Sequence, residues 1–219
     1  WLMMTAGVAF TYAKPVDKMH PGRPPRSLFA PAVLISTLGQ AAIHLWCMVE
    51  AVRIATEAMG PEKLAEVKAF NRKVEQKWAA EEAALEDNPE AEEVDMVTQM
   101  WSLWASPFMP NLMNTVVFLV ETAQMMAVMF VNYKGRPWMK GILENHPLCL
   151  SVFACFGGVA FCAWNVSPWI NEKIHLAPFP DDDFRYYVMF LCFVSFFGTF
   201  VWDRLVTFLF DRRSFFTAK

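Results

Sequence analysis

The sequence lacks the short motifs that mark most soluble enzymes. It contains no G-x-x-x-x-G-K-[ST] loop, no H-E-x-x-H and no Ser-His-Asp signature. Its four histidines, His20, His44, His146 and His175, do not have the spacing of metal ligands. We therefore expect no catalytic residue, no metal site and no bound cofactor in this segment, and no nucleic-acid partner.

Charged residues are also scarce. They make up 19% of the 219 residues, whereas hydrophobic residues make up 55% and aromatic residues 15%. Such a chain is too apolar for an ordinary soluble domain. A helix needs about 20 residues to cross roughly 30 Å of hydrocarbon. We therefore expect an all-α, polytopic integral membrane helix bundle with four full transmembrane helices, at 27–52, 111–133, 147–170 and 184–210.

A fifth apolar stretch, at 1–13, is too short to cross a bilayer. It has neither the basic region nor the small-residue cleavage site of a signal peptide. We interpret it as the end of a truncated transmembrane helix, and the chain as a fragment of a longer protein.

The five cysteines form no C-x-x-C pair and lie in or beside the apolar stretches, which favours buried small hydrophobic residues over disulfides or metal ligands. They are Cys47, Cys149, Cys155, Cys162 and Cys192.

The signs of the charges alternate from one connection to the next. Lys and Arg dominate at 14–26, 134–146 and 211–219, whereas the region from Arg53 to Asp95 holds six basic and twelve acidic residues. Short loops rich in Lys and Arg stay in the cytosol. The pattern predicts cytosolic loops at 14–26 and 134–146, a cytosolic tail at 211–219, and lumenal or external connections at 53–110 and 171–183.

The long connection at 53–110 has a helical pattern of its own. Apolar residues recur every three or four positions between Pro61 and Asp87, which predicts an external amphipathic helix. After Asn88 and Pro89, Trp101 and Trp104 favour a segment on the bilayer surface. The external helix is either a solvated acidic lid or a docking surface for another subunit.

Several polar residues lie inside the predicted spans, where each is costly in lipid. Gln40 and His44 share one helix face, and Asn114, Glu121 and Gln124 share another. These five residues line a transport or binding cavity, or make hydrogen bonds between helices. Asp203 and Arg204, near the end of the last span, are interpreted as an interfacial pair that compensates its own charge.

Irregular loop sequences carry a family resemblance over nearly the whole chain. The quoted stretches are "FMPNLMNTVVF", "NYKGRPWM" with "ENHPL", "TYAKPVDKM" with "RPPRSLF", and "WDRLVTFLF". Together they resemble the C-terminal membrane region of the type-V, subclass A P-type ATPases of the endoplasmic reticulum. In that family these motifs occur in the same order, from the end of the sixth transmembrane helix to the close of the tenth.

The resemblance implies an ATP-driven dislocase that removes misinserted transmembrane helices from the endoplasmic-reticulum membrane. ATP and Mg²⁺ would bind cytoplasmic domains elsewhere in the parent protein. This segment would be the support half of the membrane domain, and its partners would be the lipid bilayer, the missing N-terminal helices and cytoplasmic domains, and the cargo helix. Glu121 departs from the small or apolar residue expected at its depth in the family.

The alternative hypothesis is a small, non-enzymatic membrane subunit or scaffold. It would bind a partner through the acidic external helix between Pro61 and Asp87.

Overall fold

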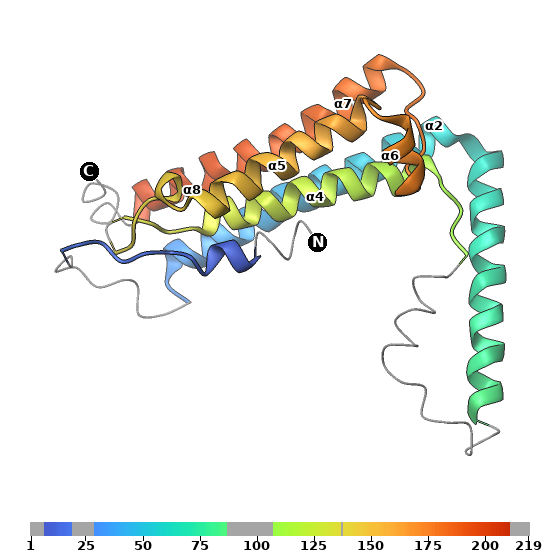
Figure 1. Ribbon diagram of the computed structural model, residues 1–219, viewed down its shortest axis with the longest axis horizontal. Helices are drawn as coiled ribbons and strands as arrows, with labels where there is room; N and C mark the ends of the chain where they lie inside the picture. Colours follow the sequence, from blue (N-terminus) through green and yellow to red (C-terminus); the bar gives the residue numbers. More distant parts are fainter. Residues whose placement is uncertain (1–6, 19–28, 87–106, 137, 211–219) are drawn as a thin grey trace.

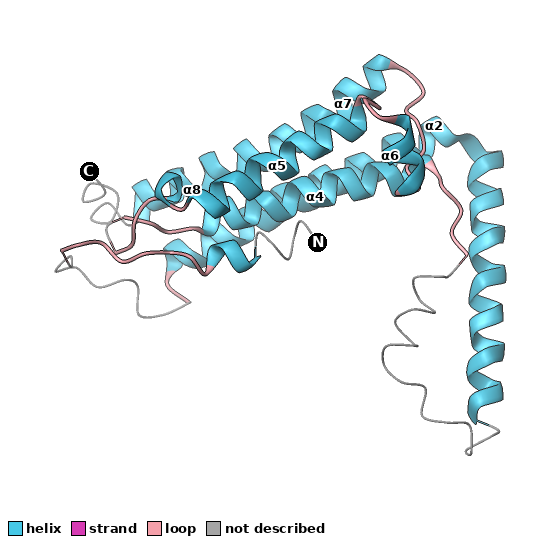
Figure 2. Cartoon of the chain, viewed as in Figure 1, coloured by secondary structure: helices cyan, strands magenta, loops and turns pink. Residues whose placement is uncertain are grey.

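The computed structural model describes residues 7–18, 29–86, 107–136 and 138–210. These residues form helices and turns, and the only extended pairing among them is an isolated bridge between Pro15 and Met139. Four helices are long and apolar enough to cross a membrane. Figures 1 and 2 show them side by side in an elongated bundle. The predicted all-α membrane bundle with four spans is therefore confirmed.

The first span belongs to α2 (Pro31–Glu86), which is kinked at Gly60. Gly60 has a φ of 71°, a value that glycine adopts without a Cβ clash, and the following Pro61 has no N–H to donate. The helix before the kink continues past position 52, where sequence analysis ended the span. Beyond the kink, residues 61–86 turn sharply away from the bundle and form an arm (Figure 1).

The next two spans are α4 (Leu112–Asn132) and α5 (His146–Ala163), each capped by an asparagine. Asn111 Oδ1 accepts from the amide of Asn114 at 2.9 Å, and Asn145 Oδ1 accepts from that of Leu148 at 3.3 Å. The 3₁₀ turn η1 (Ile142–Glu144) precedes α5. Side-chain caps thus fix both starting points.

The third span ends earlier than the predicted range 147–170. Asn165 adopts a positive φ of 49°, and the short helix α6 (Pro168–Lys173) follows as a separate element. The guanidinium of Arg185 donates to the carbonyl of Ala163 at 2.9 Å, which satisfies one of the free carbonyls at the end of α5.

The last span consists of α7 (Asp182–Phe193), the π-helical turn η2 (Val194–Gly198) and α8 (Thr199–Phe210). Asp181 caps its start by accepting from the amide of Phe184 at 2.7 Å. The predicted external segment at 87–106, including Trp101 and Trp104, lies outside the described residues. So do residues 1–6 of the predicted truncated helix, of which a helical turn at 7–10 is described, and the tail at 211–219.

Two apolar clusters hold the bundle together. One joins α2, α4, α5 and α7 around Leu119, Val120 and Leu191. The other joins the turn at 7–10 to α4, α5 and η2, through Ala9, Met126 and Phe196. Every span therefore contributes to a shared interior.

A close contact between α2 and α8 depends on Gly39. The indole of Trp202 lies directly against it and donates to the carbonyl of Ile35 at 3.1 Å. A Cβ built on Gly39 would lie 1.9 Å from Trp202 Nε1 and 2.1 Å from its Cε2.

We expect Gly39→Ala to lower the free energy of unfolding by about 1–3 kcal/mol, because the added methyl forces apart two packed helices. Gly157→Ala is the matched control, since a Cβ at that helical position meets nothing within 4 Å. Heating the full-length protein in detergent, followed by size-exclusion chromatography, measures the loss. Equal melting temperatures for the two variants would contradict this packing.

Candidate functional site

A buried carboxylate joins three parts of the chain at one end of the bundle. Asp203 of α8 is 2% exposed. Lys134, just after α4, places Nζ 2.7 Å from Asp203 Oδ1 and 2.6 Å from Oδ2. Ser36 of α2 donates its hydroxyl to Oδ1 at 2.7 Å. An ionised group in the interior of a membrane protein needs partners of this kind, and both oxygens have one.

The network continues along α2 and back to α4. Gln40 Nε2 donates to Ser36 Oγ at 2.9 Å, and Asn132 Nδ2 lies 3.4 Å from Gln40 Oε1. We call Ser36, Gln40, Asn132, Lys134 and Asp203 the polar seam. It ties the first, second and last spans together through side chains alone.

The prediction that Asp203 and Arg204 compensate each other's charge is wrong. Consecutive residues on a helix point about 100° apart, so both side chains do not face the same neighbour. Asp203 points inward to Lys134, whereas the exposed Arg204 lies with its guanidinium 5.0 Å from the centroid of the Phe200 ring. The correct partner is 69 positions away in the sequence, and no local pattern identified it.

A second polar contact lies deeper in the bundle. His44 Nδ1 is 2.7 Å from the hydroxyl of Ser195, and Gln124 of α4 donates to the carbonyl of His44 at 2.9 Å. Within the described part of the chain, the buried His44 Nε2 has no hydrogen-bond partner. The face shared by Gln40 and His44 therefore meets both α4 and the last span.

The π turn η2 rotates the last span so that Ser195 and Asp203 lie on the same side of the helix. In an unbroken α-helix, Ser195 and Asp203 would be turned about 80° apart, because each residue turns the helix by about 100°. A π turn holds one extra residue, which reduces the difference to about 20°. Thr199 Oγ1 lies within hydrogen-bond distance of the carbonyls of Ser195, at 2.7 Å, and Phe196, at 3.0 Å. Both Ser195 and Asp203 thereby face α2.

The loop between α4 and α5 is held by hydrogen bonds within itself and to the N-terminal segment. Tyr133 Oη donates to the carbonyl of Lys140 at 3.1 Å, and the amide of Lys140 donates to the carbonyl of Lys14 at 2.9 Å. A Cβ on Gly135 would lie 2.9 Å from Gly141 Cα, so only glycine fits this crossing. Asn145 Nδ2 also donates to the carbonyl of Ala9 at 3.0 Å. The loop binds the N-terminal segment to the bundle.

Glu144 closes the same loop. It accepts from the amide of Gly141 at 2.6 Å and lies 3.2 Å from the guanidinium of Arg136. The Gly141 amide, with Arg136 as the weaker cause, lowers the pKa of the Glu144 carboxyl from its ordinary value.

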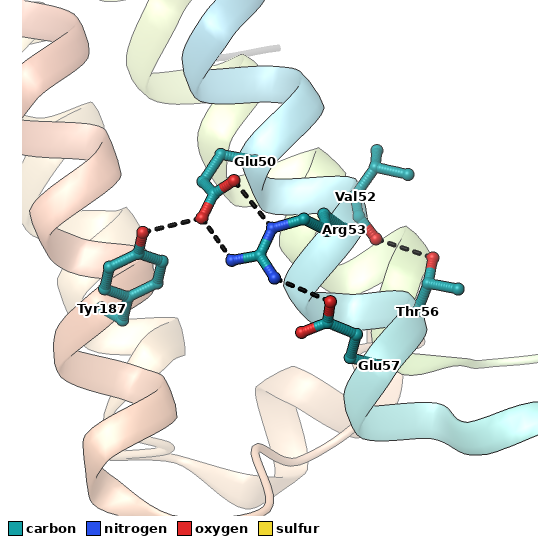
Figure 3. A network of polar contacts seen from close by, with 6 residues as sticks. All are labelled: Glu50, Val52, Arg53, Thr56, Glu57 and Tyr187. Carbon is teal, nitrogen blue, oxygen red and sulfur yellow. Dashed lines mark hydrogen bonds and ion pairs between the residues drawn. The ribbon is translucent and has the colours of Figure 1, made fainter.

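A separate charged cluster lies nearer the opposite end, between α2 and α7 (Figure 3). Arg53 donates to Glu50 at 2.9 Å and 2.5 Å and to Glu57 at 2.7 Å, while Tyr187 Oη donates to Glu50 at 2.8 Å. Figure 3 shows Glu50 between the two helices, flanked by Arg53 on one side and Tyr187 on the other. The charge of Glu50 is thus compensated by Arg53 where α2 meets α7.

Asn114, Glu121 and Gln124 were predicted to share one face of their helix, but the structure turns them in different directions. Gln124 turns toward α2, but Asn114 and Glu121 are exposed. Among the described residues, neither carboxylate oxygen of Glu121 has a hydrogen bond or ion pair. The five polar candidates therefore do not line one common cavity wall. No three His, Cys, Asp or Glu side chains of the described ranges converge as metal ligands.

Known relatives match almost the whole chain. An endoplasmic reticulum transmembrane helix translocase of Aspergillus fumigatus is 25% identical over 210 residues, or 96% of this chain. A probable manganese-transporting ATPase of Arabidopsis thaliana is 26% identical over 203 residues, or 93% of the chain. The Saccharomyces cerevisiae transmembrane helix translocase of the endoplasmic reticulum is 23% identical over 209 residues, or 95%. No protein-family model matches the chain.

The chain spans only 13% to 14% of the length of these relatives. The resemblance indicated by the loop motifs is confirmed, and the chain corresponds to a membrane-spanning segment of much longer proteins. Two of these relatives are named as translocases of the endoplasmic reticulum, and the third as an ATPase.

We expect Lys134→Met to destabilise the protein by roughly 1–3 kcal/mol, because it leaves the buried Asp203 carboxylate without its cation. This is less than for a fully buried pair, since the Lys134 side chain is 46% exposed. The double variant with Lys134→Met and Asp203→Asn should lose less in melting temperature than the sum of the losses of the two single variants. Arg204→Met is the control and should have little effect. If Arg204→Met lowered the melting temperature as much as Lys134→Met, Arg204 would be the partner of Asp203 after all.

We expect Glu144→Gln to lower the melting temperature at neutral pH but not in strong acid. Because the pKa of Glu144 is lowered in the folded state, its stabilising effect is present above the ordinary value of 4.5 and is lost as pH falls through the folded value. Melting curves of wild type and variant between pH 7 and pH 3 measure the difference. A difference that does not narrow below pH 4.5 would contradict the assignment.

Proposed function

We propose that this chain is the membrane-domain support segment of an ATP-driven P-type transporter that moves transmembrane helices out of the endoplasmic-reticulum membrane. The observation that carries the proposal is the similarity, over 93% to 96% of the chain, to relatives of which two are named for this activity. ATP and Mg²⁺ are used by other parts of the full-length protein.

The packing of the four spans supports such a role. A support unit has to keep its helices in fixed register while neighbouring helices move. The polar seam binds α2, α4 and α8 through the Asp203 carboxylate, and the loop with Gly135 and Asn145 binds the N-terminal segment at the same end. These contacts resist separation of the spans at that end.

The proposed orientation puts the polar seam and the C-terminus on the cytosolic side. Lys134, Arg136 and Lys140 lie in the loop at that end, and Lys and Arg favour the cytosol. The arm at 61–86 then extends into the lumen, where we propose a solvated surface for it.

Manganese transport is the second candidate, favoured by the name of the Arabidopsis relative alone. Mn²⁺ prefers oxygen ligands from carboxylates, carbonyls and water. Glu50 and Asp203 are each paired with a cationic side chain, and among the described residues Glu121 does not converge with two further His, Cys, Asp or Glu side chains. The described spans therefore supply helix packing rather than an evident Mn²⁺ site.

The test uses the full-length protein reconstituted in lipid vesicles with a fluorescent, singly spanning reporter helix. We expect ATP to release the reporter to a soluble helix-binding acceptor, and Lys134→Met to reduce release severalfold, because the support unit loosens. Arg204→Met should leave the rate near that of wild type. Uptake of Mn²⁺ in the same vesicles, with no release of the reporter, would reject helix translocation in favour of the second candidate.

A further inference from the structure

Two buried cysteines lie where the first span packs against the last. Cys47 belongs to α2 and is 0% exposed, and Cys192 belongs to α7 and is 1% exposed. Both are free thiols in the structure. Neither belongs to the polar seam, and because this chain itself buries both side chains, their surroundings are described completely by its own helices.

The register of the two helices places these cysteines opposite each other. The first and last spans run antiparallel (Figure 1), and His44 Nδ1 lies 2.7 Å from the hydroxyl of Ser195. Cys47 is three residues after His44, and Cys192 is three residues before Ser195. Residues three apart share a helix face. A step of three forward along α2 and three backward along the last span therefore leads from one contact to the next.

A second contact brackets the pair from the other side. Tyr187 Oη donates to Glu50 at 2.8 Å, one turn beyond the cysteines (Figure 3). The Cys47 thiol interacts with the hydroxyl of Ser195 and, electrostatically, with the thiol of Cys192. Cα atoms of α2 and α7 come within 8 Å of each other, close to the roughly 4.4–6.8 Å that a disulfide joins. The two thiols thus face each other across one helix interface.

The arrangement does not provide a zinc site. Zinc sites in proteins use at least three protein ligands. His44 lies one turn from Cys47 on the same helix, but no three His, Cys, Asp or Glu side chains among the described residues converge. The chemistry open to two facing thiols without a third ligand is disulfide formation.

We propose that Cys47 and Cys192 form a redox-sensitive pair, which hydrogen peroxide converts into a disulfide that joins the first span to the last. One sulfur attacks a peroxide oxygen, the O–O bond breaks, and a sulfenic acid and one water result. The second sulfur attacks the sulfenic sulfur, and the hydroxyl leaves as water with the remaining thiol proton. Two thiols are oxidised to one disulfide, and one peroxide is reduced to two waters.

Burial determines which oxidant acts and which product forms. Bulky or charged reagents do not reach a thiol without exposed surface, whereas hydrogen peroxide is small and uncharged. The reaction is slow, because the attacking sulfur has to lose its proton in apolar surroundings. Once a sulfenic acid forms, the facing thiol is the nearest group that can react with it, so the disulfide forms in preference to further oxidation.

The test treats the full-length protein in lipid vesicles with hydrogen peroxide, alkylates the remaining thiols in denaturant and digests the protein with trypsin. Cleavage after Lys and Arg leaves Cys47 as the one cysteine of peptide 27–53 and Cys192 as the one cysteine of peptide 186–204. We expect mass spectrometry to find most of these two peptides linked to each other, and the link to disappear on reduction with dithiothreitol.

Cys155→Ala is the matched control, because Cys155 is also 1% exposed but lies on α5, within peptide 141–173. This variant should form the link as wild type does. Cys47→Ala and Cys192→Ala should each abolish it. Oxidised wild type should melt several degrees above the reduced protein, because the disulfide restricts the unfolded chain, and Cys47→Ala should show no such difference.

Three results would overturn the inference. Cys47 and Cys192 would remain fully alkylated after peroxide treatment, or they would be linked to peptide 141–173, or the link between them would occur only in dimers on a non-reducing gel. A wild-type profile in size-exclusion chromatography shows that each variant is folded. The outcome is independent of the proposed function, because no step of the experiment measures transport.

Discussion

The need to compensate one buried carboxylate governs the arrangement of this bundle. Asp203 lies in the interior at 2% exposure, where an unpaired charge would be prohibitive. Its oxygens bring Ser36 of the first span and Lys134 of the loop after α4 to the last span. Because lipid offers no hydrophobic force between helices, side-chain hydrogen bonds and close packing have to supply the specificity. The seam does this at one end, and the contact of Gly39 with Trp202 supports it.

The π turn and the connecting loop are consequences of the same constraint. The extra residue at Val194–Gly198 turns Ser195 and Asp203 onto one side, so that both meet α2. The loop after α4 has to carry Lys134 back over the bundle and still begin α5 a few residues later. Gly135 permits the close crossing, and Glu144 and Asn145 close the turn. An irregular loop sequence thus follows from a precise geometric requirement.

The bundle also separates compensated charge from uncompensated charge. Inward charges have partners from neighbouring helices, whereas Glu121 faces outward without one among the described residues. That division suits a support unit whose remaining surface meets other helices.

The sequence by itself determined the number of spans and the shared face of Gln40 and His44. Hydropathy and helix periodicity are local properties, so they can be read without the fold. Tertiary structure alone decided the partner of Asp203 and the division of Gln124 from Glu121. Both depend on how a helix is rotated against neighbours far away in the sequence, as the separations of 69 between Lys134 and Asp203 and 80 between Gln124 and His44 illustrate. Local patterns carry no information about that rotation, because it is set by the packing of all four spans together.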